Sequence, residues 1–126
     1  MATILLSIKP MYVKKIFSGE KKYEYRKHLS QVPVEKIIVY STDPEQKVVG
    51  EIKISGTLKM SPTRLWEQTK HEAGISREKF RKYFKGCQTA FAYQLGETTM
   101  FKKPKELSDY GISQAPQSFV YINREE

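Results

Sequence analysis

The chain has 126 residues and a formal net charge of +8, since 22 lysines and arginines stand against 14 acidic residues. This length is that of one domain with one hydrophobic core, and it is too short for two. The single cysteine, Cys87, excludes an internal disulfide, and we expect a reducing, cytoplasmic setting. The basic balance favours a polyanionic partner such as RNA, DNA or a nucleotide.

Four strands and one helix are predicted in the first half of the chain. The apolar run at residues 3–8 is typical of a buried strand, and it is too short for a signal peptide or a membrane span. Pro10 begins a helix and Gly19 ends it. The strands that follow cover residues 22–27, 36–41 and 47–58. Gly50 interrupts the last of them, which predicts a bulge or a close backbone approach.

The second half begins with helices and returns to strands. Pro62 opens a helix that runs to Gly74, and Ser76 caps a second helix that ends at Gly86. Further strands are predicted at residues 89–95, 99–102 and 118–122. The first two of these form a hairpin across Gly96. Strands on both sides of a helical insertion predict an α+β fold, a small closed or partly closed β-barrel with helices packed outside it.

The sequence contains no metal-ligand spacing, no phosphate-binding glycine loop and no nucleophile motif, so we expect no metal and no cofactor. His28 and His71 lie in unrelated segments and are expected at the surface. Cys87 is expected to be a packed thiol rather than a nucleophile. Trp66 has helical spacing and aromatic neighbours, which favours a core anchor over a base-stacking platform.

The segment GEKKYEYR concentrates charges of both signs and two tyrosines directly after the first predicted helix. Its Gly19, Lys21, Glu24 and Arg26 match the Gly-x-Lys-x-x-Glu-x-Arg signature of the ASCH domain family, a branch of the PUA-like superfold. Three flanking segments also resemble that family, namely LLSIKPMYVKKIFSG, VVGEIKI and APQSFVYI. The resemblance implies one PUA-like mixed β-barrel domain over residues 1–126, with a cleft beside the first helix suited to RNA or a nucleotide-like ligand.

The side chains expected in this cleft come from the motif and from nearby strand ends. Glu24 accepts a base's amino hydrogens, Arg26 holds a phosphate or Glu24 itself, and Lys21 places a cation at the cleft mouth. A purely structural ion pair between Glu24 and Arg26 is the alternative, and the two interpretations are compatible. The expected ligand-binding residues are Ser7, Lys9, Lys21, Lys22, Glu24, Arg26, Tyr40, Ser41, Gln117 and Ser118.

Two basic groups lie outside the motif strand. The first comprises Lys14, Lys15, Lys21 and Lys22, and the second is the helix at residues 77–85. Such a run is usually a solvated face, but the two groups would form a stripe that follows RNA phosphates if they fold onto one side.

Three classes of function remain open. The first is a module that binds RNA or a nucleotide in the cleft. The second is a small hydrolase, because the ASCH proteins that this chain resembles include acetylcytidine amidohydrolases and ribonucleases. Those amidohydrolases combine the motif lysine, here Lys21, with a threonine and a distant glutamate. Glu24 stands in place of the threonine and Glu51 is an unaligned counterpart of the glutamate, so Lys21, Glu24 and Glu51 are the catalytic candidates. The third class is regulation through a protein partner, which the sequence neither supports nor excludes.

Overall fold

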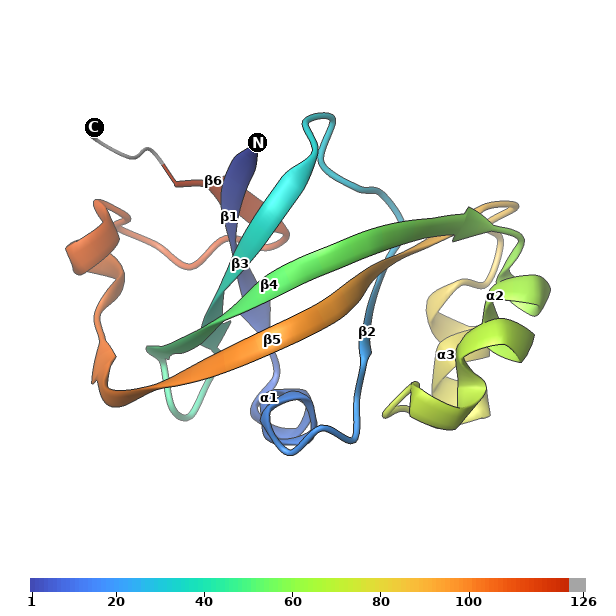
Figure 1. Ribbon diagram of the computed structural model, residues 1–126, viewed down its shortest axis with the longest axis horizontal. Coiled ribbons are helices and arrows are strands. Elements are labelled where there is room, and N and C mark those ends of the chain that lie inside the picture. Colours follow the sequence, from blue (N-terminus) through green and yellow to red (C-terminus); the bar gives the residue numbers. More distant parts are fainter. Residues whose placement is uncertain (123–126) are drawn as a thin grey trace.

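The computed structural model describes residues 1–122, which form a six-stranded sheet with three α-helices (Figure 1). The strands are β1 (Ala2–Ile8), β2 (Tyr23–Arg26), β3 (Val34–Ser41), β4 (Lys47–Met60), β5 (Ala90–Lys105) and β6 (Phe119–Tyr121). The helices are α1 (Pro10–Phe17), α2 (Pro62–Thr69) and α3 (Arg77–Tyr83), with short 3₁₀ turns at Lys70–Glu72 and Leu107–Tyr110. Within the described residues, no helix combines the length and apolarity that a membrane crossing requires.

The sheet has the strand order β2-β5-β4-β3-β1-β6, so β2 and β6 are its two edges. β1 and β3 are parallel, and the other neighbouring strands are antiparallel. The sheet curls into a half-barrel, which brings the loop after β2 back to β6. There the hydroxyls of Ser30 and Tyr121 are 2.6 Å apart and share a hydrogen bond. The predicted α+β fold, a partly closed barrel with helices around it, is confirmed.

Apolar side chains form three buried clusters. The concave face of the half-barrel holds the first cluster, in which Val13 and Ile16 of α1 pack against Ile4, Leu6 and strands β3 to β5. The second cluster joins α2 and α3 to β2 and the start of β5. The third lies on the opposite face of β1 and β3, below the segment that follows β5. The two helical units therefore pack against different parts of the sheet, and the gap between them lies next to β2.

The first and last strands are neighbours, as a PUA-like barrel requires. Leu6 pairs with Phe119 and Ile4 pairs with Tyr121, in antiparallel register. Gly50 marks the expected bulge, because the register of β4 shifts beside it. An added Cβ at Gly50 would lie 2.5 Å from the carbonyl oxygen of Thr99, so the close backbone approach is confirmed as well.

Two expectations about element boundaries were wrong. Residues 89–95 and 99–102 do not form a hairpin across Gly96, because β5 continues through this glycine and pairs with β4 on both sides of it. β4 and β5 form one long pair of strands (Figure 1). Their pairing shifts register near Gly96, and the chain makes no turn there. The helix that begins at Pro62 ends at Thr69, and a 3₁₀ turn rather than α-helix leads toward Gly74.

Candidate functional site

A pocket of about 470 Å³ opens where the half-barrel is not closed, between the end of β1, α1, β2 and α3. We call it the seam pocket. β6 pairs with β1 only from Ile4 to Leu6, so the edge of β1 beyond Leu6 is free to line the opening. The lining comprises Ser7, Ile8, Lys9, Met11, Tyr12, Lys21, Glu24, Tyr25, Arg26, Ile75, Lys79, Lys82 and Tyr83. Pockets of this volume are typical of small-ligand sites.

Lys21 lies at the inner wall of the seam pocket. Gly19 has φ +88°, a conformation that favours glycine, and it lets the chain leave α1 and turn toward β2. Lys21 is 4% exposed, and its Nζ donates a hydrogen bond to the carbonyl oxygen of Ala73 at 3.0 Å. The same ammonium group lies 4.8 Å from the ring centroid of Tyr25 and 5.5 Å from that of Tyr12. The expectation that Lys21 stands at the cleft mouth was therefore wrong, because the loop before α3, with Ala73 and Gly74, covers it.

Burial lowers the pKa of Lys21, because a charged ammonium group loses its hydration there. The nearby carboxylate of Glu24 opposes this effect, while the charges of Lys15 and Arg26 lower the pKa further. The seam pocket thus contains an amine that gives up its proton more readily than an exposed lysine.

Glu24 and Arg26 project from the same face of β2, as the alternation predicted. Their side chains form an ion pair of 3.1 Å between Oε2 and Nη2 and are 12% and 15% exposed. The Nε of Arg26 is buried and has no hydrogen-bond partner among the described residues. The structural ion pair proposed from the sequence is present, and both of its side chains also line the seam pocket.

Tyrosines give the seam pocket aromatic surface. The hydroxyl of Tyr25 lies 2.6 Å from Thr69 Oγ1 in a buried hydrogen bond, and burial raises the pKa of Tyr25 to about 12. Tyr83 lies on the α3 side, where Lys27 Nζ is 4.9 Å from its ring centroid. Tyr12 and Tyr83 were missed by sequence reasoning, and their only signal was helical spacing beside basic residues.

Several residues expected in the cleft are not among those that line it. Lys22 is exposed on the other side of the α1–β2 loop, and Tyr40 is buried in the third cluster. Ser41 is fully buried, and its Oγ has no hydrogen-bond partner among the described residues. Gln117 and Ser118 are exposed next to Pro116, whose carbonyl oxygen accepts a hydrogen bond from Ser7 Oγ at 2.7 Å.

Glu51 also lies away from the seam pocket. It stands opposite Ile38 on the face of the third cluster, and its carboxylate is 3.3 Å from Lys36 Nζ. Lys21, Glu24 and Arg26 line the seam pocket and Glu51 does not, so the structure does not pair Glu51 with Lys21.

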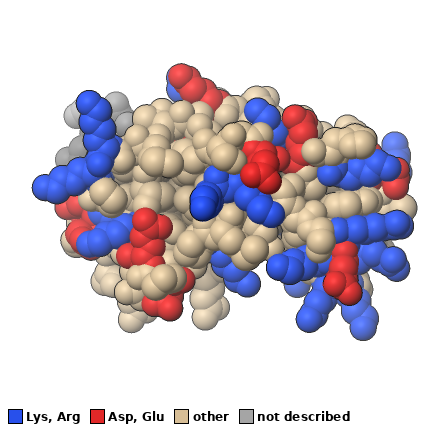
Figure 2. Space-filling view, turned by 90° about the horizontal axis from the view of Figure 1, so that it is seen from below, with Lys and Arg blue, Asp and Glu red and all other residues tan. Residues whose placement is uncertain are grey.

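Basic side chains gather beside the seam pocket. Lys79 and Lys82 of α3 line it, and Lys9 reaches it from the end of β1. In Figure 2 the molecule is seen from the α1 side, and blue side chains crowd the end that α2 and α3 form. A second blue group lies over α1, which carries Lys14 and Lys15. No cluster of histidine, cysteine and acidic side chains suited to a metal ion occurs within residues 1–122.

Comparison with known proteins assigns the family. The model of the ASCH domain matches residues 6–105, which is most of the chain. This protein belongs to the ASCH domain family. The sequence resemblance carried by the motif is thereby confirmed, and so is the PUA-like fold that the resemblance implied.

Individual relatives are similar to this chain over nearly its whole length. A protein named ASCH domain-containing ribonuclease from Zymomonas mobilis is 27% identical over 126 residues, which cover 97% of this chain and 85% of that protein. The crystal structure of ASCH from Zymomonas mobilis superposes with a TM-score of 0.89 at 26% identity, covering 98% of this chain and 89% of that one. A protein named ATP synthase subunit alpha from Ureaplasma parvum is 31% identical over 121 residues, which cover 95% of this chain but only 15% of that protein.

Proposed function

We propose that this protein binds RNA or a nucleotide-like ligand and that the seam pocket holds one nucleotide of a single strand. The observation that carries the proposal is the Glu24–Arg26 pair, which lies largely buried in a pocket of nucleotide-sized volume with three lysines, Lys9, Lys79 and Lys82, around it. A carboxylate and a guanidinium held together can read a base edge, and surrounding lysines can hold phosphates.

Each group has a part in this proposal. Glu24 accepts hydrogen bonds from the exocyclic amino group of a base, and Arg26 fixes the orientation of that carboxylate. The ring of Tyr83 offers a face on which a base can stack, since single-stranded RNA is recognised largely through stacking and base edges. Lys79 and Lys82 come from one side of α3 and face the same opening. The name of the Zymomonas mobilis relative, a ribonuclease, supports RNA as the ligand class.

Fluorescence anisotropy with labelled single-stranded RNA tests the proposal. Lys79→Gln combined with Lys82→Gln should weaken binding, because two phosphate contacts are lost at the rim of the seam pocket. Lys102→Gln combined with Lys103→Gln is the matched control, since these lysines are exposed near the other end of β5. If the two double variants lose RNA affinity equally, binding is a general attraction between charges and not a contact at the seam pocket. The absence of binding by the unchanged protein would refute the proposal.

A second candidate function is hydrolysis, and the lowered pKa of Lys21 is the observation that favours it. A lysine whose pKa is lowered by burial can take up a proton as a general base at a lower pH than an exposed lysine. Among the residues that line the seam pocket, Glu24 is the only carboxylate, and it is already paired with Arg26. We therefore rank hydrolysis second.

An assay of substrate hydrolysis distinguishes the two candidate functions, RNA binding and hydrolysis. We expect little hydrolysis of acetylcytidine by the unchanged protein, because Glu24 stands where the amidohydrolases of this family carry a threonine. Cleavage of labelled RNA, or turnover of acetylcytidine, that disappears in Lys21→Met would place the enzyme first.

A further inference from the structure

Helix α3 separates the seam pocket from a second hollow. Its residues Lys79, Lys82 and Tyr83 line the seam pocket, while Arg77 and Arg81 line a hollow of about 380 Å³ between α3 and α2. We call this hollow the helical groove. Residues three and four apart share a helix face, so the two sets occupy adjacent faces of one short helix. An RNA strand that leaves the seam pocket across α3 would therefore reach the helical groove.

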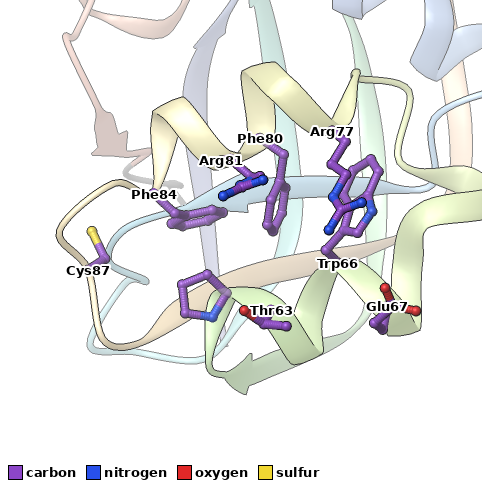
Figure 3. Close-up of a pocket in the computed structure, with 9 residues that line it drawn as sticks. Thr63, Trp66, Glu67, Arg77, Phe80, Arg81, Phe84 and Cys87 are labelled. Carbon is purple, nitrogen blue, oxygen red and sulfur yellow. The ribbon is translucent and has the colours of Figure 1, made fainter.

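The floor and wall of the helical groove are aromatic (Figure 3). Phe80 and Phe84 are 1% and 2% exposed and form the floor, and Trp66 from α2 stands half-buried at the side. The ring centroids of Trp66 and Phe80 are 5.0 Å apart. Trp66 packs against the second cluster, as predicted, and its remaining surface faces the groove.

The groove carries a surplus of positive charge. Arg77 and Arg81 are exposed, and none of the ion pairs found among the described residues includes either of them. The carboxylate that lines the groove, that of Glu67, is 2.9 Å from Lys70 Nζ, which lowers the pKa of Glu67. The groove thus offers two guanidinium groups beside an aromatic surface. The negative charge of Glu67, which also lines it, is balanced by Lys70.

We infer that the helical groove is a second nucleotide subsite, in which a base stacks on Trp66 while Arg77 and Arg81 hold the adjoining phosphates. This inference rests on the proposed function, because the strand that occupies the groove is the one whose other nucleotide fills the seam pocket. Guanidinium groups bind phosphate bidentately and also stack on aromatic rings, which suits a single strand that turns across a helix. α3 carries four basic residues, Arg77, Lys79, Arg81 and Lys82, against one acidic residue, Glu78.

The composition of the groove favours RNA over an acidic peptide. A peptide helix needs a continuous apolar groove with spaced anchors, and an acidic peptide is recognised by arginine clusters with no need of aromatic surface. Here the apolar floor is short, its aromatic rings are tilted against one another, and arginines border it on the α3 side. A planar base with a phosphate on each side matches that arrangement of one aromatic surface and two cations.

Trp66 makes the inference directly measurable, since it is the only tryptophan in the chain. A base stacked on the indole ring is expected to quench its fluorescence. We expect a hexanucleotide of single-stranded RNA to quench Trp66, and a mononucleotide, which occupies the seam pocket alone, to leave its emission unchanged. Anisotropy of the labelled hexanucleotide under the same conditions reports binding independently of Trp66.

Substitutions in the helical groove test whether the longer RNA binds there. Arg77→Gln combined with Arg81→Gln should lower the ratio of hexanucleotide to mononucleotide affinity, and Trp66→Leu should lower it by about five-fold to a hundred-fold, the range of base stacking on an aromatic ring. The arginines are at the surface, so their replacement keeps the fold even if Trp66→Leu does not. Lys102→Gln combined with Lys103→Gln removes the same charge elsewhere and should leave the ratio unchanged.

The outcomes separate this inference from the proposed function. If the hexanucleotide binds by anisotropy but neither quenches Trp66 nor loses its advantage in the arginine variant, the subsite is wrong and binding in the seam pocket stands. If no RNA binds at all, both fall. Quenching by an acidic peptide but not by RNA would overturn the inference in favour of a protein partner.

Discussion

The ammonium group of Lys21 has exchanged its hydration for one backbone carbonyl and the faces of two tyrosine rings. Such contacts compensate a buried charge only in part, which is why the pKa of Lys21 is lowered. A charge kept in this position at a cost to stability is typical of a functional site. Lys21 is therefore the residue at which stability and the second candidate function, hydrolysis, oppose each other most directly.

The lowered pKa of Lys21 has a definite sign in the stability of the protein. Between the lowered pKa and 10.5 the unfolded chain binds more protons than the folded one, so this group makes the folded state more stable as pH rises. Lys21→Met keeps the aliphatic stem and removes the titration. We expect the stability of Lys21→Met relative to the unchanged protein to fall between pH 7 and pH 10, by about 1.4 kcal/mol for each unit of lowering. Urea unfolding at the two pH values measures it, and a difference that does not vary with pH would contradict the burial of a charged Lys21.

Gly74 offers a second probe of the same side chain. It has φ +65°, and an added Cβ would lie 2.5 Å from Cβ and 2.6 Å from Cγ of Lys21. Gly86 has φ +84° with nothing within 4 Å of an added Cβ, so Gly86→Ala carries the backbone strain alone, about 1–2 kcal/mol. We expect Gly74→Ala to lose a further 1–3 kcal/mol or so in unfolding free energy and to weaken RNA binding, since Lys21 must move. Equal behaviour of the two variants in unfolding and in anisotropy would show that Lys21 adapts freely.

At the scale of elements, the contact between α1 and the β4–β5 ribbon depends on Gly50. A Cβ at this position would lie 2.5 Å from the carbonyl oxygen of Thr99 and 2.6 Å from Cζ of Phe17 in α1. The backbone carbonyl of Thr99 cannot yield without separating the strands, and the Phe17 ring would have to leave its place between α1 and β4. α1 in turn forms one wall of the seam pocket.

We therefore expect Gly50→Ala to lower the free energy of unfolding by roughly 1–3 kcal/mol, the usual cost of overpacking. Gly56 lies in the same strand, but an added Cβ there would meet the end of the flexible Gln94 side chain, which can rotate away. Gly56→Ala is thus the matched control, with a smaller expected loss. Thermal or urea unfolding compares the two, and a loss in Gly56→Ala as large as that in Gly50→Ala would mean that backbone flexibility, not the close approach, is what the glycines provide.

Element types were largely readable from the sequence, because local patterns determine them. Pro10 and Gly19 bound α1 closely, and Ser76 caps α3 with its side chain accepting a hydrogen bond from the backbone N–H of Lys79. The continuation of β5 through Gly96 was not readable. A glycine signals a turn or a close approach equally well, and only the partner strand decides, here through Lys53, whose carbonyl oxygen would lie 3.0 Å from an added Cβ.

At the scale of the whole molecule, the sequence predicted the part of the seam pocket that is local in the chain. Lys21, Glu24 and Arg26 are close in sequence, and their convergence required only one turn and one strand. Lys79 and Lys82 join them through the path of the fold, which a basic helical run does not specify. Glu51 was misplaced because the bulge at Gly50 changes which residues of β4 face each side, and a shift of one residue reverses the face.

The distribution of charge leads to a prediction about salt. Each phosphate that a cation neutralises in single-stranded RNA contributes a slope of about −0.7 in log K against log[salt]. Lys79→Gln combined with Lys82→Gln should make the slope shallower by about 1.4, the sum of two such contributions. Anisotropy titrations over a range of salt concentrations measure it. A slope that changes instead in Lys102→Gln combined with Lys103→Gln would place the bound RNA near the other end of β5.

The pairing of β1 with β6 closes the chain on itself. The backbone N–H of Ile122 donates a hydrogen bond to the carbonyl oxygen of Thr3 at 2.9 Å, so the two ends of the described chain meet on one side of the sheet. A domain whose entry and exit points coincide can be inserted into a surface loop of a host protein without forcing that loop apart. Because α1, β2 and α3 frame the seam pocket elsewhere, such an insertion would leave the pocket open.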